Sequence, residues 1–169
     1  VTAGGETKKN LYFYKANQLA FQKNGMDRNL WDSAVQFKDE LITRKFPPES
    51  GVQATYRFTL EAKVPEPLVI VIERPDLYTV TCNGAPVAPV QGAWWLDKAF
   101  GKVDITKAAK VGANEVTLKA APFTIYHELE PAYLLGDFTL KPADSGFVVA
   151  PSGALSVKAD GWSRQGHPF

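Results

Sequence analysis

The chain contains very little cysteine and histidine, the residues that form disulfides and thiolate or imidazole metal sites. It has one cysteine, Cys82, and two histidines among 169 residues. A single cysteine excludes an internal disulfide and a cysteine-based metal site. Cys82 alternates with Val80 and Tyr78, which predicts a buried structural thiol rather than a nucleophile.

An excess of charge and a long apolar run are also missing. The chain has 19 basic and 18 acidic residues, scattered along its length, and no basic run is longer than Lys8-Lys9. We therefore expect no nucleic-acid partner and no contact with an anionic membrane surface. The apolar run at 68–72 has the length of a strand, far short of the ~20 residues of a membrane-spanning helix.

Apolar and aromatic residues are abundant, and they occur in short patterned stretches. With 169 residues and 45% apolar content, the chain can bury a full core as one domain. We expect residues 1–9 to form a polar lead-in and residues 10–169 to form a single domain. The chain starts at Val1 and stops at Phe169, so we expect a piece excised from a larger multidomain enzyme.

Short strands separated by Gly, Pro and Asn dominate the second half of the sequence, which predicts an all-β antiparallel sandwich. Asn83-Gly84 is a strong signal for a two-residue hairpin. Residues 10–21 are read as two strands. The spacing after Ser33 predicts one short helix at 33–44, with an irregular strand as the rival. The other expected strands are 52–60, 68–72, 77–82, 103–105, 114–119, 133–140, 146–150 and 154–158.

Two adjacent tryptophans, Trp94 and Trp95, are the most informative aromatic residues. Neighbouring side chains on a strand point to opposite faces, so one ring can pack inward while the other is presented to solvent. A presented ring suits the apolar face of a sugar, because a flat aromatic surface gives much contact with few rotamers to freeze. The alternative is that both rings cover the core or a hairpin. Asp97 is expected to accept a hydrogen bond from a backbone amide or to bind an outer ligand.

A second cluster lies at 123–131, with the sequence FTIYHELEP. Tyr126, His127, Glu128 and Glu130 can hydrogen-bond sugar hydroxyls, and the two carboxylates leave Ca²⁺ open as a ligand. The alternative is an edge strand with solvated carboxylates and one satisfied histidine. Neighbours on one strand seldom flank a glycosidic bond, so we expect no catalysis from this cluster alone.

The motifs at 80–118 resemble those of galactose-binding-like jelly-roll domains attached to bacterial glycoside hydrolases. The sugar-binding domain of glycoside hydrolase family 2 has a similar order: an Asn-Gly hairpin, a Trp followed by an Asp, Val-Asp-Ile-Thr, then Gly-x-Asn. The segments YHELEPAYLLGDFTL and GWSRQGHPF look like those of the accessory sandwich in α-L-rhamnosidase-like enzymes. The resemblance implies the jelly-roll form of the sandwich.

The resemblance also implies a function: a non-catalytic carbohydrate-binding module, outside the cell or in the periplasm, that places the catalytic domain of the same polypeptide on a polysaccharide. No cofactor is expected, with Ca²⁺ left open. One alternative is a structural domain that packs on its parent catalytic domain and has no ligand. Another is a glycosidase or lyase, which requires two acids, or an acid and a histidine, in one cleft. The expected carbohydrate-binding residues are Trp94, Trp95, Asp97, Tyr126, His127, Glu128 and Glu130.

Overall fold

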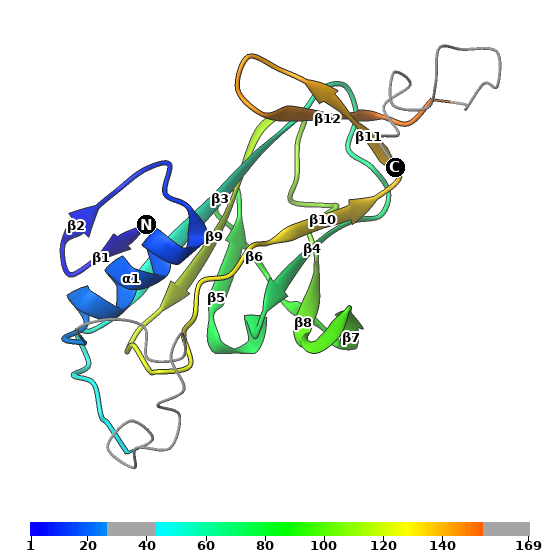
Figure 1. Cartoon of the computed structure of the whole chain (residues 1–169). Coiled ribbons are helices and arrows are strands. Elements are labelled where there is room, and N and C mark those ends of the chain that lie inside the picture. Colours follow the sequence, from blue (N-terminus) through cyan, green and yellow to red (C-terminus); the bar gives the residue numbers. More distant parts are fainter. Residues whose placement is uncertain (27–42, 154–169) are drawn as a thin grey trace.

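Two sheets pack face to face in the computed structural model, which describes residues 1–26 and 43–153 (Figure 1). This confirms the predicted all-β sandwich. Every pairing is antiparallel except the short one between β12 and β3. Sheet A has the order β11–β12–β3–β9–β5–β6, with bounds Phe138–Pro142, Phe147–Pro151, Val52–Leu60, Gly112–Ala120, Thr79–Cys82 and Ala85–Val87. Sheet B has the order β10–β4–β8–β7, with bounds Tyr133–Gly136, Leu68–Glu73, Asp97–Asp104 and Pro89–Trp95.

The predicted hairpin at Asn83-Gly84 is confirmed. Both residues have positive φ, 51° and 83°, as a two-residue turn between right-twisted strands requires. The turn sets the register of β5 and β6, in which Cys82 lies opposite Ala85. Cys82 has no exposed surface, and burial raises its pKa, so the prediction of a structural thiol is also confirmed.

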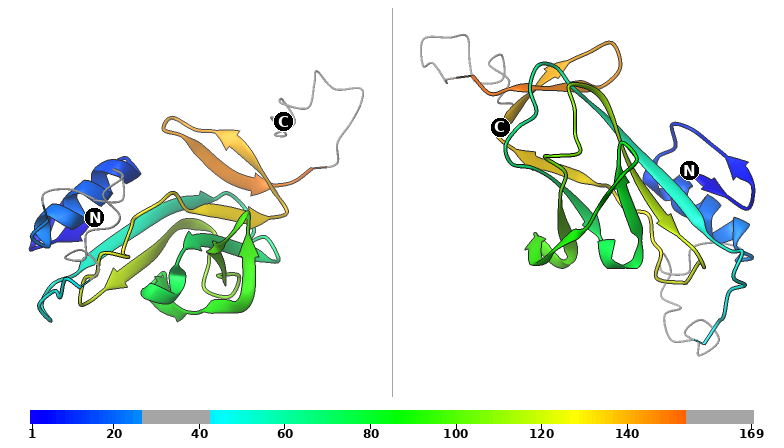
Figure 2. Two further views of the ribbon diagram at one scale, coloured as in Figure 1. Left: turned by 60° about the horizontal axis from the view of Figure 1, so that its bottom comes forward. Right: turned by 180° about the vertical axis from the view of Figure 1, so that it is seen from behind.

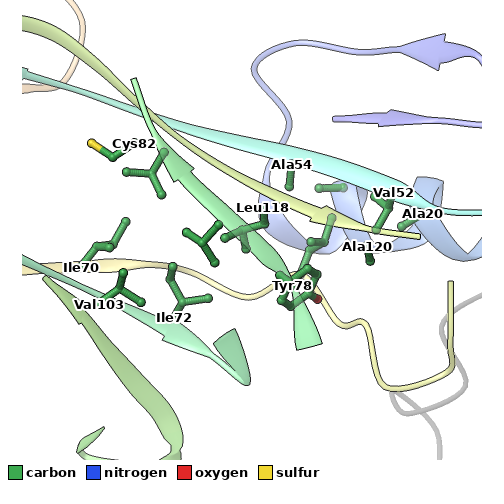
Figure 3. Packing of buried hydrophobic residues seen from close by; sticks show 14 of the residues in the cluster. Ala20, Val52, Ala54, Ile70, Ile72, Tyr78, Cys82, Val103, Leu118 and Ala120 are labelled. Carbon is green, nitrogen blue, oxygen red and sulfur yellow. The ribbon is translucent and has the colours of Figure 1, made fainter. Parts of the chain in front are cut away.

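The core lies between the two sheets (Figure 3). Ile70, Ile72 and Val103 of sheet B face the sheet A side chains, which include Leu118 and Cys82. Alternation along β4 sends Leu68, Ile70 and Ile72 inward and therefore turns the residues between them to the outer face. This alternation fixes which side chains of sheet B are available to form a surface site.

The N-terminal part differs from the prediction. Residues 10–21 do not form strands: α1 spans Phe13–Lys23. The strand reading relied on alternating residues such as Phe13, which is exposed, whereas Ala16, Leu19 and Ala20 are buried at helical spacing. Residues 1–9, expected as a lead-in, form a small hairpin of β1 (Thr2–Ala3) and β2 (Glu6–Thr7) beside β3.

Two predicted elements fall largely or wholly outside the described residues. These are the helix at 33–44, of which only the last two positions are described, and the strand at 154–158. Helix α1 and the strands β7 and β8 lie on opposite sides of the molecule in both the front and back views (Figures 1 and 2). Surfaces on α1 and on sheet B are therefore separate.

A sharp change of direction after β4 shapes the lower end of sheet B. Arg74 has a φ of 43°, and the 3-10 helix η2 (Pro75–Leu77) follows it. Pro75 packs closely on β8: a Cβ on Gly101 would lie 2.6 Å from its Cγ. Glycine at 101 is therefore needed for this approach. The turn brings Glu73 and Arg74 to the segment 123–132.

Candidate functional site: an acidic cleft beside an aromatic shelf

A cleft of about 250 Å³ lies where β4, β8 and the segment 123–132 meet. The Arg74 backbone N–H donates to the Ala99 carbonyl over 2.7 Å and joins the ends of β4 and β8 at this point. Tyr126 is 48% exposed and gives the cleft an aromatic wall. The lining residues are Glu73, Arg74, Ala99, Tyr126 and Glu128.

Buried hydroxyl and amide groups hold the backbone of this segment in place. The Tyr56 hydroxyl donates to the Glu130 carbonyl over 2.6 Å, and the Tyr78 hydroxyl donates to the Glu128 carbonyl over 2.9 Å. The side chain of Asn17 in α1 accepts from the Leu129 N–H over 3.0 Å. Burial, and then the charges of Glu130 and Glu73, raise the pKa of Tyr56 to about 12. Burial also raises the pKa of Tyr78, so both tyrosines act as neutral donors to the backbone.

His127, expected as a sugar ligand, is instead buried, with 4% of its surface exposed. Its Nδ1 accepts from the Thr124 N–H over 2.8 Å, which leaves Nε2–H to donate to the Leu77 carbonyl at 3.0 Å. Burial lowers its pKa. The geometry matches the satisfied histidine of the alternative prediction, but the edge strand of that alternative is wrong, because residues 123–132 form no strand. Both ring nitrogens face groups of the chain rather than the cleft.

Carboxylates gather around the cleft and disfavour one another's ionisation. Burial raises the pKa of Glu73, and the charges of Glu128 and Asp97 raise it further. Burial likewise raises the pKa of Glu130, followed by the charges of Glu73 and Glu128. These acids come from β4, from β8 and from the segment 123–132, so the fold, not the local sequence, brings them together.

The cation in the cleft lining is engaged elsewhere. The Arg74 guanidinium binds Asp76 through two hydrogen bonds, of 3.0 Å from Nε and 2.9 Å from Nη2. This fork geometry uses the planar guanidinium in its strongest mode. The hydrogen bonds raise the pKa of Arg74 and lower that of Asp76. The charge of Arg74 also lowers the pKa of Glu73, but burial and the neighbouring carboxylates outweigh it and the pKa stays raised.

An aromatic shelf, formed by Trp95, Phe100 and Tyr133, covers the outer face of sheet B. The ring of Tyr133 lies 5.3 Å from that of Trp95 and 6.1 Å from that of Phe100. Val71 pairs with Tyr133 and points away from the core, yet it has no exposed surface. Glu73 is the cross-strand partner of Phe100, so the shelf borders the acidic cleft directly.

The two tryptophans lie at the end of β7, and neither is fully buried. Trp95 belongs to the shelf, whereas Trp94 pairs with Gly101 in the β7–β8 register and is 48% exposed. Asp97 opens β8, and its Oδ1 accepts from the Ala99 N–H over 2.8 Å. This is the contact with a backbone amide that the sequence predicted for Asp97.

The predicted site residues thus divide into four groups, one of which is Trp94 alone, exposed at the end of β7 and outside the cleft lining. Tyr126 and Glu128 line the cleft, with Glu130 and Asp97 coupled to it electrostatically. Trp95 lies on the shelf and His127 is buried. The sequence reading missed the residues that join the two parts of the site: Glu73, Arg74, Phe100 and Tyr133. Cross-strand pairing and the turn after β4 place these residues in the site, and neither can be read from the spacing of residues along the chain.

Within residues 1–26 and 43–153, no three Asp, Glu, His or Cys side chains are arranged so that they could hold a metal ion. No helix of the described chain is long and apolar enough to cross a membrane. Comparison with protein-family models, curated proteins and solved structures finds no match to this sequence. The galactose-binding-like resemblance therefore stays a prediction, and functional inference depends on the site itself.

Proposed function

We propose that this domain is a non-catalytic carbohydrate-binding accessory module of a bacterial glycoside hydrolase. The observation that supports it best is the placement of the aromatic shelf beside a polar cleft with an aromatic wall, Tyr126. A sugar ring has an apolar face and an equatorial belt of hydroxyls. Aromatic rings pack against the apolar face, and carboxylate oxygens accept hydrogen bonds from the hydroxyls.

The exposed rings have the chemistry that such a site needs. Tyr126 and Tyr133 keep part of their surface open, and aromatic side chains lose little rotamer entropy when they bind. A shallow site of this kind gives weak affinity. Weak affinity is sufficient for a tethered module, because a linked catalytic domain works at an effective concentration of the order of mM.

The enzyme alternative has less support from the geometry. Its acid-plus-histidine form needs an accessible imidazole, but His127 is buried and both of its ring nitrogens are within hydrogen-bonding distance of groups in the chain. The other histidine, His167, lies outside the described residues.

Titration with a panel of neutral and charged oligosaccharides, followed by tryptophan fluorescence and calorimetry, tests the proposal. We expect at least one glycan to bind, and Trp95→Ala and Tyr126→Ala each to weaken it about 10-fold, which corresponds to roughly 1.4 kcal/mol. Tyr12→Ala is the matched control, because Tyr12 is exposed on α1, on the other side of the molecule. A folded protein that binds no glycan, or binding that survives both substitutions, would contradict the proposal.

A second candidate function, a structural domain packing on the catalytic domain of its parent enzyme, draws support from α1. Tyr12, Phe13 and Tyr14 are all exposed at its start, and the rings of Tyr12 and Tyr14 stack at 5.8 Å. Such a patch favours a protein contact. If it is a docking face, the isolated domain should self-associate, and Phe13→Ser should reduce this in sedimentation velocity. A monomer at high concentration would count against docking.

A further inference from the structure

The charge around the cleft carries an inference about ligand class, which rests on the proposed function. We propose that the site selects saccharides that carry a protonated amine, such as glucosamine units, over uronic acids and over neutral sugars of the same length. Glu73 and Glu128 line the cleft, and Glu130 and Asp97 act on it. A positively charged ammonium group would enter a site of opposite, negative charge.

Arg74 offsets only part of the negative charge at Glu73, because the pKa of this carboxyl stays raised although the charge of Arg74 lowers it. Arg74 is held in the two-hydrogen-bond pair with Asp76. In the described part of the chain, the ion pairs between side chains include neither Glu73 nor Glu130. A ligand ammonium would therefore add positive charge where the carboxylates outweigh the one cation of the cleft lining, Arg74.

The geometry favours an organic cation over a metal ion. The described acids form no metal-binding group of three or more, because they surround an open cleft rather than converge on one point. The cleft volume, about 250 Å³, is below the ~300–1,000 Å³ of drug-sized sites, which suits a single sugar residue. The neighbouring shelf can take the next ring of an oligosaccharide.

The aromatic wall of the cleft also favours a positively charged ligand. The face of a tyrosine ring attracts a cation, because the ring carries partial negative charge on its face. Tyr126 is exposed in the cleft lined by Glu73 and Glu128. An ammonium there would contact the carboxylates and the ring together, whereas a uronate carboxylate would meet like charge.

The experiment compares three oligosaccharides of equal length: a glucosamine tetramer, its N-acetylated form and a galacturonic acid tetramer. Calorimetry near pH 6 and at low salt should show the glucosamine tetramer binding at least ~10-fold more tightly than the acetylated one, with the galacturonate weakest. The preference should shrink as salt is added, because exposed charges are screened. It should also shrink at lower pH, where Glu73 and Glu130 take up protons.

Charge-neutralising variants identify the groups responsible. Glu73→Gln and Glu130→Gln should each reduce the preference for the amine several-fold, measured as the ratio of the affinities for the glucosamine tetramer and its acetylated form. Glu66→Gln is the matched control, since Glu66 is exposed and precedes the opposite end of β4. Circular dichroism and thermal melts check that each variant is folded, and either variant alone is sufficient for the test.

The outcomes of these experiments distinguish the preference for an amine from carbohydrate binding itself. Equal binding of the amine and acetylated forms, or a preference for galacturonate, overturns the charge inference and leaves carbohydrate binding in place. A preference for the amine that Glu66→Gln reduces as much as Glu73→Gln does would show a general charge effect and also overturns it. Failure of every glycan to bind a folded protein overturns both.

Discussion

Replacing Asn114 by alanine should be among the most damaging single substitutions in this fold. Asn114 is 1% exposed, and all four of its side-chain hydrogen-bonding positions are used. Its Oδ1 accepts from the Lys110 N–H and from Asn83 Nδ2, both at 2.9 Å. Its Nδ2 donates to the carbonyls of Lys110 and Gly112, at 2.7 and 2.9 Å. The side chain thus fixes the turn that starts β9.

The magnitude follows from these contacts. Each hydrogen bond contributes about 1 kcal/mol net, and a buried partner left unsatisfied costs more. Lys110 is exposed, so water can reach its backbone groups after the substitution and recover part of the loss. The free energy of unfolding should therefore fall by about 2–3 kcal/mol, and Tm by roughly 5–10 °C for a domain of this size.

Urea unfolding followed by tryptophan fluorescence measures this loss. Gln91→Ala is the control, since Gln91 is exposed on β7, and surface substitutions of this kind stay within about 0.5 kcal/mol. A loss below about 1 kcal/mol for Asn114→Ala, with an unchanged m value, would refute the argument. It would mean that water replaces the asparagine network and that the β9 turn is held by strand pairing alone.

Three further predictions concern the site and its surroundings. Because the pKa of His127 is lowered in the fold, stability should fall as pH drops through about 6.5, no more steeply than ~1.4 kcal/mol per pH unit; urea midpoints of His127→Gln should lose this dependence. The pKa of Glu73 is raised, so its contribution weakens the fold as pH rises above about 4.3. Glu73→Gln should raise Tm at pH 7 and leave it unchanged near pH 3. The gain in the free energy of unfolding at pH 7 should be less than ~1 kcal/mol, because the carboxylate is accessible to solvent. Leu96 has a φ of 67° and is 69% exposed; Leu96→Gly should stabilise the domain by about 0.5 kcal/mol in urea titrations, since glycine has no left-handed penalty, and a loss of stability would contradict this.

The strands were predictable because their signal is local. Alternation over Val52–Leu60 and the turn at Asn83-Gly84 each act within a few residues. A Cβ on Gly136 would lie 2.8 Å from the Pro67 carbonyl oxygen, so the glycine allows a close backbone approach within an otherwise apolar strand. Helix α1 was missed because its first turn is aromatic and exposed, which hides the helical spacing of the buried alanines.

The site was predictable only where its residues are neighbours in sequence. Tyr126 and Glu128 were found, and so was Trp95. Glu73 was not found, because it reads as the polar end of an apolar strand and gains its role from pairing with Phe100. The burial of His127 could not be predicted either, because it depends on contact with Leu77 of η2, which lies 50 residues earlier in the chain.

The backbone explains why the shelf and the cleft adjoin. Two non-glycine residues with left-handed φ, Arg74 and Leu96, flank this region, and each such conformation costs on the order of 1–2 kcal/mol. The turn at Leu96 is so tight that Trp95 pairs directly with Asp97, which puts an aromatic ring and a carboxylate side by side. The turn at Arg74 directs its guanidinium to Asp76 and leaves Glu73 at the cleft. Relaxed connections would separate these groups, so the strain is located where the two halves of the proposed binding surface meet, as is common at functional sites.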